Sequence, residues 1–520
     1  MVIPDVKAQI GAQAYSELVK LIGQLETKYR RNKLRADFYD MKHAFRDLRI
    51  AIPPMLRDLE AVVGWPAKAV DMLAARVRVA GVALPGGNLD AFGIPEMIGG
   101  VDDFAGLVDE ATTSALIHAS AFVMTTLGDS SRGEPPVVFT VHDGFSATGE
   151  WSKARRGLET GLVVADVDKS GSPTRYVLLT PVSAAEIVLE DYRWVARVWQ
   201  HDLGRVPLEP VTYKRRAMRP FGSSRISRAV MSLTESAMRT VARSEVGAEF
   251  FSAPQRYMLG ADRSAFENPD GTPSPLWSLV TGRMLMYPDA ADETGSEIKI
   301  GQFPQVSMQP HSDQMRMWAE MFAAETQLPV GALGIVQDNP SSAEAIFASK
   351  EDLIIEAERT ATAFGAAWRR ALLTGVQLVE GLRQAPPELA GLAIRWHDPS
   401  TPSRAQSTDA VMKQIQAGVL PADSDVALEQ LGYSETDIGR IRAHRAAASD
   451  PLAMLAGAVT RQTDTGGAMK ERFDALGVAV RAGVDPEAAA KAVGLDGIEF
   501  TGAVPVSLRV PERDAALLEP

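Results

Sequence analysis

Closely spaced carboxylates are the first candidates for chemistry in this sequence. Asp102 and Asp103 are adjacent, and Asp166 and Asp168 are separated by one residue. Carboxylate oxygens at such spacings could bind a divalent cation. Acidic residues are also common in turns, and this structural interpretation is favoured for both pairs, so we predict no metal site.

Histidine is the second candidate residue type. His397 precedes Asp398, an order that could supply a base and an orienting carboxylate. Adjacent side chains rarely point at one another, so a turn at a strand end is the favoured interpretation. No two histidines are four residues apart, which excludes a helical ligand pair. The seven histidines are His43, His118, His142, His201, His311, His397 and His444.

The usual catalytic signatures are missing from the chain. There is no Gly-x-x-x-x-Gly-Lys-Ser/Thr loop, no Gly-x-Gly-x-x-Gly, no His-Glu-x-x-His and no Gly-x-Ser-x-Gly. The absence of cysteine excludes disulfides, Cys-ligated zinc, iron–sulfur clusters and thiol nucleophiles. We therefore predict a protein that is not an enzyme and has no catalytic residues and no cofactor.

Composition is that of a globular chain large enough for several cores. The 520 residues are 46% hydrophobic and 23% charged, and the net charge is −12. No apolar run is long enough to span a membrane, and the N-terminus does not resemble a signal peptide. The acidity fits either an ordinary acidic protein or a surface past which DNA can slide, and charge alone does not separate these alternatives.

The elements that must position any site begin with residues 12–51. The pattern there is mixed, and Leu18, Leu21, Ile22 and Leu25 lie at helical spacing. The basic run is Lys28, Arg30, Arg31, Lys33 and Arg35. A solvated helix end is favoured for this run over a nucleic-acid patch. Further elements are expected as a helix over 65–80 running into a strand at 76–82, a helix from 101, a strand at 121–127 and an antiparallel β region over 137–213.

Two amphipathic helices follow, over 223–251 and 311–327, with short β-type runs between them. The apolar side of the first carries Ile226, Val230, Leu233, Ala237 and Val241. Its other side carries the polar-face candidates Arg228, Glu235, Arg239 and Arg243. In the second, Met315, Trp318, Met321 and Phe322 are expected to pack on one side. This order predicts a helical hairpin with a β-structured insertion.

The remainder of the chain is predicted to be mainly helical. A loop over 330–342 precedes a long helix that begins with a Ser341–Glu344 capping box, ends near 382 and extends about 60 Å. A strand at 392–396 and helices at 403–416, 423–431 and 435–448 follow. Residues 451–520 are expected to be a peripheral, partly mobile segment.

Several long segments resemble portal proteins of tailed bacteriophages, specifically siphophages of actinobacteria and other Gram-positive hosts. PFGSSRISRAVMSLTESAMRTVARSEVGAEFFSAPQRYMLG (220–260) is similar to their first stem helix and clip entry, and LPVGALGIVQDNPSSAEAIFASKEDLIIEAERTATAFGAAWRRAL (328–372) to their tunnel loop and long helix. IRWHDPSTPSRAQSTDAVMKQIQAGVLP (394–421) resembles their crown-side segment. With weaker similarity at 65–82 and 117–128, the resemblance covers most of residues 60–445 in the expected order.

The resemblance implies an α+β, mainly helical portal fold with a wing, a stem helical hairpin, a small β clip and a helical crown. The implied boundaries are wing 1–220, first stem helix 221–251, clip 252–308, second stem helix 309–328, tunnel loop 329–342, long helix and wing return strand 343–400, crown 401–450 and peripheral C-terminal segment 451–520.

The resemblance also implies a function. Copies of the chain, usually twelve, would form a ring at one capsid vertex through which double-stranded DNA passes without sequence specificity. The implied partners are the major capsid and scaffolding proteins, the large terminase and then the head–tail adaptor, with no membrane. The ring would assemble in the host cytoplasm and reside in the virion. The alternatives are another ring-forming head or connector protein and an α+β enzyme with an unrecognised site.

Two groups of residues are candidates for contact with DNA or partners. In the loop, Gln337, Asp338 and Asn339 offer polar contact without positive charge, or else Asn339 with Pro340 only prepares the start of the helix. The clip would carry an acidic rim that either repels phosphates or contacts protein partners. The rim candidates are Asp262, Glu267, Asp270, Asp289, Asp292, Glu293 and Glu297.

Overall fold

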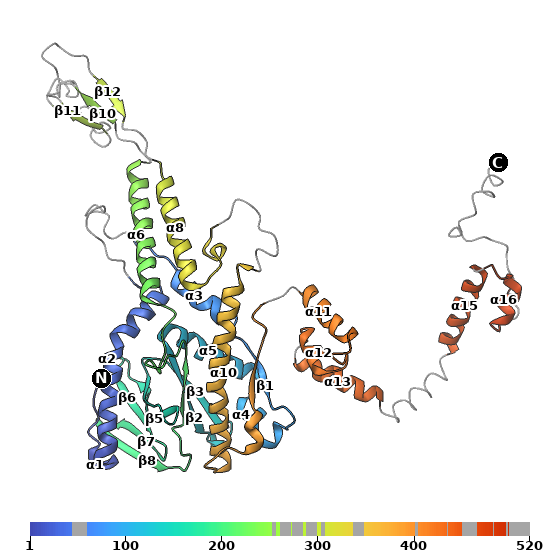
Figure 1. The fold of residues 1–520 in the computed structure, drawn as a ribbon, viewed down its shortest axis with the longest axis horizontal. Helices are drawn as coiled ribbons and strands as arrows, with labels where there is room; N and C mark the ends of the chain where they lie inside the picture. Colours follow the sequence, from blue (N-terminus) through green and yellow to red (C-terminus); the bar gives the residue numbers. More distant parts are fainter. Residues whose placement is uncertain are drawn as a thin grey trace. The chain divides into compact units, whose positions relative to one another are not determined.

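The chain forms two compact units, residues 1–401 and 402–520, in a computed structural model. The structure describes residues 1–43, 60–251, 256–259, 272, 284–287, 299–302, 307–335, 348–400, 404–433, 435–449, 465–481, 483–495 and 498. Helices and strands both contribute extensively to the first unit, which confirms the predicted α+β class (Figure 1).

The first unit contains helices and strands in alternating groups. Its α-helices are α1 (Lys7–Ile10), α2 (Ala12–Tyr39), α3 (Trp65–Ala74), α4 (Ile94–Ile98), α5 (Val101–His118), α6 (Arg228–Phe251), α8 (Gln309–Thr326) and α10 (Glu351–Glu380). Its strands are β1 (Val79–Ala83), β2 (Ser120–Leu127), β3 (Val137–His142), β4 (Ala147–Ser152), β5 (Gly157–Val167), β6 (Pro173–Leu179), β7 (Ser183–Glu190), β8 (Arg193–Gln200), β9 (Leu208–Thr212), β10 (Arg256–Leu259), β11 (Met284–Tyr287), β12 (Lys299–Gln302) and β13 (Ala393–Trp396). Short 3-10 helices are η2 (Asp90–Phe92), η3 (Ser130–Arg132), η5 (Val330–Leu333) and η6 (Pro387–Gly391).

A five-stranded antiparallel sheet, in the order β4-β5-β6-β7-β8, lies beside α2 (Figure 1). The leucines predicted to share one helical face are buried against it, because Leu18, Leu21 and Leu25 pack with Tyr176 and Ile187. Gln9 closes part of the exposed edge of β8, since its side-chain amide donates to Trp194 O at 3.1 Å and accepts from Ala196 N at 2.6 Å. The Gln9 side chain thus makes the hydrogen bonds to Trp194 and Ala196 that a sixth strand would otherwise make.

The main core lies between a three-stranded sheet, β3-β2-β9, and helices α3, α5 and α10. Trp368 of α10 is fully buried at its centre, with its ring centroid 5.1 Å from that of Phe104. The roots of α6 and α8 join the same core through Ile226 and Phe322. Burial of these side chains therefore couples the hairpin helices to the body of the unit.

Strand β1 pairs with β13 to form a separate antiparallel ribbon in which Val79 lies opposite Trp396. The inserted strands between α6 and α8 form a sheet in the order β11-β10-β12, with β10 parallel to β11 and antiparallel to β12. The predicted β insertion is therefore present in the sequence interval between the two hairpin helices.

The structure corrects the sequence predictions for the long helix α10 and for Met321. The long helix α10 begins at Glu351, after a turn at Ser349 and Lys350, so the prediction of a continuous helix from residue 343 was wrong. Acidic residues Glu351 and Asp352 occupy its first turn, where they favour a helix start. Its thirty residues extend about 45 Å. Met321 is 49% exposed and does not pack in the core with Phe322.

The second unit is helical in the part that the structure describes. It contains α11 (Arg404–Gln416), α12 (Asp425–Gln430), α13 (Glu435–Ser449), α15 (Thr465–Arg481) and α16 (Pro486–Ala492). The first three match the predicted helices. Helices α15 and α16 were not predicted and pack together through Leu476, Ala489 and Ala490. Among the described helices, none is both long enough and apolar enough to cross a membrane.

Candidate functional site: the helical hairpin and its root

Helices α6 and α8 form an antiparallel pair (Figure 1). Polar contacts hold the pair along its length. Near the root, Ser227 Oγ donates to Glu325 Oε1 at 3.1 Å. Farther along, Trp318 Nε1 donates to Thr240 Oγ1 at 3.2 Å. Small buried residues such as Ala237 and Ala323 allow the two backbones to approach closely. The predicted helical hairpin is therefore confirmed.

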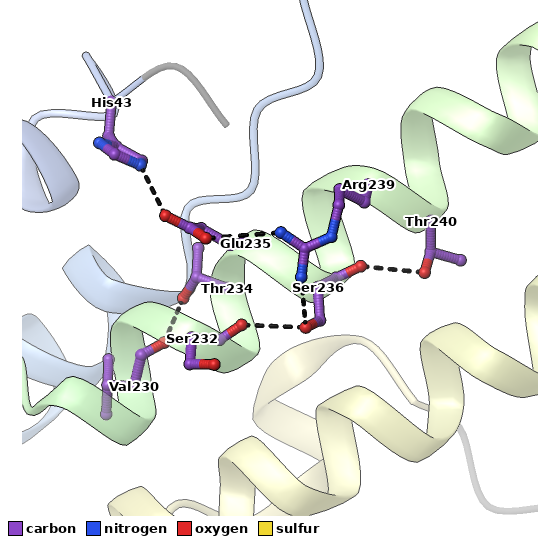
Figure 2. Close-up of polar contacts among 8 residues, drawn as sticks. All are labelled: His43, Val230, Ser232, Thr234, Glu235, Ser236, Arg239 and Thr240. Atoms are coloured by element: carbon purple, nitrogen blue, oxygen red, sulfur yellow. Dashed lines mark hydrogen bonds and ion pairs between the residues drawn. The ribbon is translucent and has the colours of Figure 1, made fainter. Parts of the chain in front are cut away.

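The predicted polar face of α6 is partly assembled by the fold (Figure 2). Arg239 lies 3.4 Å from Glu235 and donates to Ser236 Oγ at 3.0 Å. His43 Nε2 lies 3.0 Å from Glu235 Oε1, which joins the end of the α2 segment to α6. Of the other two candidates, Arg228 is exposed and Arg243 is half-buried.

Hydroxyl groups of α6 bond back to the carbonyl oxygens four residues earlier (Figure 2). Thr234 donates to Val230 O at 2.8 Å, Ser236 to Ser232 O at 3.0 Å, and Thr240 to Ser236 O at 3.0 Å. Such bonds satisfy the hydroxyl internally and slightly weaken and bend a helix. They explain how Thr234 and Thr240 can be buried on the face that contacts the rest of the unit.

A buried ionic network fixes the root of the hairpin. Arg225, three residues before the start of α6, donates through Nε to Ala69 O of α3 and through Nη2 at 2.7 Å to Thr326 O at the end of α8. It also donates to Tyr213 Oη at 3.1 Å, and Tyr213 donates to Glu356 Oε1 of α10 at 2.5 Å. One guanidinium therefore links both hairpin helices to the body.

The negative charge of Glu356 in this root network is compensated by Lys214 at the edge of the network. Lys214 Nζ lies 3.0 Å from Glu356 Oε1, while Glu356 itself is 5% exposed. Burial raises the pKa of the Tyr213 hydroxyl, which Arg225 partly offsets and Glu356 reinforces. Tyr213 is thus held as the neutral donor between a guanidinium and a carboxylate.

The turn that leads into α6 depends on Gly222, whose φ is +67°. A Cβ atom at this position would lie 1.9 Å from Tyr213 O and 2.7 Å from Thr212 Cγ2. The close approach exists because Ser223 N donates to Tyr213 O at 3.0 Å. Glycine is therefore required here to bring the two backbones together.

The sequence did not predict the root network. No spacing relates Arg225, Tyr213 and Glu356, which come from separate elements, and each residue type is ordinary on a surface. The only local signal is a charged residue, Arg225, directly before a strongly apolar helical face.

Two groups of predicted contact residues lie outside the described part of the chain. The loop candidates are Gln337, Asp338 and Asn339, and the capping-box residues Ser341 and Glu344 lie in the same interval. The acidic rim candidates are Asp262, Glu267, Asp270, Asp289, Asp292, Glu293 and Glu297. Their roles stay predictions.

Three of the carboxylates considered for metal binding or base catalysis have structural partners. Asp166 pairs with Arg175, and Asp168 accepts from the backbone nitrogens of Ser170 at 2.8 Å and Ser172 at 2.9 Å. Asp398 accepts from Ser400 N at 2.8 Å, in a turn at the end of β13. Asp102 and Asp103 lie in the first turn of α5. Within the described residues, no cluster of three potential ligands could hold a metal ion.

The basic run lies within α2, not at its end. Lys33 pairs with Asp37 at 2.9 Å, whereas Lys28 is largely buried, with its ammonium 5.1 Å from the ring centroid of Phe221. Burial, together with the positive charge of Arg31, lowers the pKa of Lys28 to about 8 from an ordinary value near 10.5. The expected solvated helix end is therefore incorrect for Lys28.

Replacing Lys28 by methionine is expected to raise the free energy of unfolding near neutral pH. Between about pH 8 and pH 10.5 the unfolded chain holds a proton that the folded chain has lost, so stability rises with pH in this window. The stability of the Lys28→Met variant does not rise with pH in this window. The difference in free energy of unfolding between the variant and the wild type therefore shrinks as the pH increases. Urea unfolding at several pH values measures the difference.

Lys33→Met is the matched control, because the hydrogen bond to Asp37 raises the pKa of Lys33. That variant should not gain stability at neutral pH. If the two variants behaved alike across the pH range, burial of Lys28 would not be the cause of the effect.

In this arrangement, polar networks brace a helical hairpin against an α+β body. The chain belongs to the family of SPP1 Gp6-like phage portal proteins, whose family model matches residues 19–448. This match confirms the resemblance seen in the sequence and extends it toward the N-terminus. Portal proteins are structural components of the virion, which fits the prediction that the chain is not an enzyme.

Two mycobacterial phages contain portal proteins that are similar to this chain. The portal protein of Mycobacterium phage D29 is 27% identical over 437 residues, which cover 80% of this chain and 85% of the relative. The portal protein of Mycobacterium phage L5 is 28% identical over 418 residues, covering 76% of this chain and 81% of the relative.

Solved particles of a gene transfer agent (GTA) contain similar chains. A chain of the neck of the native particle, computed with C12 symmetry, aligns at 15% identity with a TM-score of 0.39, covering 74% of this chain and 94% of that one. A chain of the native virion aligns at 13% identity with a TM-score of 0.38, covering 70% and 89%.

Proposed function

We propose that twelve copies of this phage portal protein form a ring at one capsid vertex, through which the genome is packaged and later ejected. The observation that carries the proposal is the family match over residues 19–448, which includes both hairpin helices and α10. Within the ring, residues 221–251 and 309–328 serve as the stem, 252–308 as the clip, 329–342 as the tunnel loop and 401–450 as the crown. Residues 1–220 and 343–400 serve as the wing, and 451–520 as a peripheral segment.

The partners proposed for this ring follow the order of particle assembly. The ring assembles in the host cytoplasm with the major capsid and scaffolding proteins. It then docks the large terminase, and after packaging it docks the head–tail adaptor. Double-stranded DNA passes through it without sequence-specific contacts.

An exposed apolar pair on α8 supports assembly of the hairpins side by side. Met317 is 43% exposed and Met321 is 49% exposed, and their spacing of four residues places them on the same side of the helix. Burial of such a pair against a neighbouring copy would remove apolar surface from water. A ring of hairpins supplies that neighbour.

Light scattering of the purified chain tests the ring. A species of roughly 670 kDa, twelve times the 56.0 kDa chain, is expected, and negative-stain images should show a central hole. Met317→Glu with Met321→Glu should yield smaller species. Leu127→Glu with Val167→Glu, which also changes two exposed apolar residues, should leave the ring intact. A wild-type chain that forms only small oligomers would exclude the ring.

A further inference from the structure

A group of cations on α2 and a nearby turn takes no part in the root network of Arg225, Tyr213 and Glu356. Lys28, Arg31 and Arg35 follow one another at spacings of three and four residues, so they share one face of α2. The turn after β9 adds Arg216 and Arg219, which form an antiparallel bridge with each other. We call Lys28, Arg31, Arg35, Arg216 and Arg219 the basic patch.

The two parts of the basic patch lie close together. Lys28 Nζ is 5.1 Å from the ring centroid of Phe221, which follows the turn by two residues. Burial, with the positive charges of Arg31 and Arg219, lowers the pKa of Arg35 to about 10. Charges from α2 and from the turn therefore act on the same guanidinium, across a short distance.

Neutral groups hold the basic patch in position. Lys28 donates to Thr148 Oγ1 at 2.9 Å, Arg35 donates to His118 O at 3.2 Å, and Arg216 donates to Ser223 Oγ at 3.2 Å. Among the described residues, no carboxylate forms an ion pair with any of the five cations. The acidic residues of α2 are used elsewhere, since Glu26 binds the N-terminal amine and Asp37 binds Lys33.

Five uncompensated cations are unusual on a chain whose net charge is −12. Crowding like charges costs free energy unless an anion is present to offset it. Arg31, Arg216 and Arg219 are exposed, so their guanidinium groups can reach a ligand. Guanidinium forks match phosphate oxygens in geometry, and phosphodiesters supply such oxygens at regular spacing along duplex DNA.

We propose that the basic patch binds the phosphate backbone of duplex DNA on a surface separate from the stem hairpin. The choice of DNA as the ligand rests on the proposed portal function. The basic patch does not discriminate between base sequences, because the contacts it can make are electrostatic and directed at phosphates. An acidic protein surface, such as that of a neighbouring copy, is the alternative occupant that the experiment must detect.

Closed-circular duplex DNA is the probe, because it cannot thread through a closed ring and so reports binding outside a channel. The full-length chain is titrated into fluorescently labelled circles at several salt concentrations. The test variant carries Arg31→Gln, Arg216→Gln and Arg219→Gln. The control carries Arg132→Gln, Arg197→Gln and Arg440→Gln, which removes the same charge from exposed arginines that already pair with carboxylates.

The test variant is expected to bind at least about 10-fold more weakly than the wild type at low salt. The slope of the logarithm of its binding constant against the logarithm of the salt concentration should be shallower by about 2.7, or about 0.9 for each lost phosphate contact. The control variant should bind like the wild type. Equal weakening in both variants, or none in either, would overturn the proposal.

Light scattering on the same samples separates this proposal from the proposed ring. A test variant that loses its assembled mass while its chains still bind the circles normally would show that the patch contacts another copy, which also overturns the proposal. Absence of a ring in the wild type would contradict the portal assembly and leave the DNA measurement valid.

Discussion

Arg225→Leu is expected to lower the free energy of unfolding by about 3–5 kcal/mol, because removing one member of a buried ionic network leaves the others uncompensated. The carbonyls of Ala69 and Thr326 lose their donor, and Glu356 loses the cation with which it shares Tyr213. Urea unfolding followed by tryptophan fluorescence measures the loss.

Arg228→Leu is the matched control for this prediction. Arg228 lies three residues farther along the chain and is exposed, so its replacement should change stability by no more than about 0.5 kcal/mol. Arg225→Lys keeps the charge without the planar fork and should fall between the two. Equal, small effects of both leucine variants would contradict the role of Arg225 as the link at the hairpin root.

Gly222→Ala is expected to be more damaging than a typical surface change, at more than about 4 kcal/mol. Its new methyl group would lie 1.9 Å from Tyr213 O, and the opposing group is backbone that cannot rotate away. The turn would have to open, which would displace Tyr213 from Arg225 and Glu356. Soluble yield and the midpoint of thermal unfolding are the measurements.

Gly204→Ala separates this clash from the cost of a positive φ. Gly204 has a φ of +64°, close to that of Gly222, but the nearest atoms to its added Cβ are 3.8 Å away. Its replacement should cost only the left-handed strain of about 1–2 kcal/mol. A Gly222→Ala protein as stable as Gly204→Ala would show that the close approach of the two backbones is not needed.

Periodicity predicted the helices well where apolar residues define a face. Leu18, Leu21 and Leu25 are all buried as their spacing requires, and α6 and α8 lie where the pattern placed them. Strand β4, Ala147–Ser152, lies within the predicted β region, although it contains threonine, glycine and glutamate without clear alternation. It becomes a strand because β5 provides a partner and α2 covers it.

Local patterns also misplaced individual side chains. Thr234 and Thr240 were not assigned to the buried face of α6, since threonine usually indicates exposure. Their hydroxyls are satisfied within the helix, so burial carries little penalty. The converse holds for Met321, which looks like a core residue but is exposed in a single chain. A neighbouring copy in the proposed ring would cover that position.

The root network could not be predicted because its members are brought together by folding alone. Tyr213 and Glu356 come from β9 and α10 segments that no spacing rule relates. By contrast, the basic run on α2 was visible in the sequence, but the burial of Lys28 and the proximity of the run to the turn at Arg216 and Arg219 were not.

Pairing of β1 with β13 has a consequence for the order in which the chain matures on the ribosome. Val79 pairs with Trp396, so the two-stranded ribbon cannot form until nearly the whole first unit has been synthesised. Contacts between such distant segments form slowly, because a long loop must be closed first. A nascent chain released early would lack this closure, and only polypeptides translated past β13 could complete the unit.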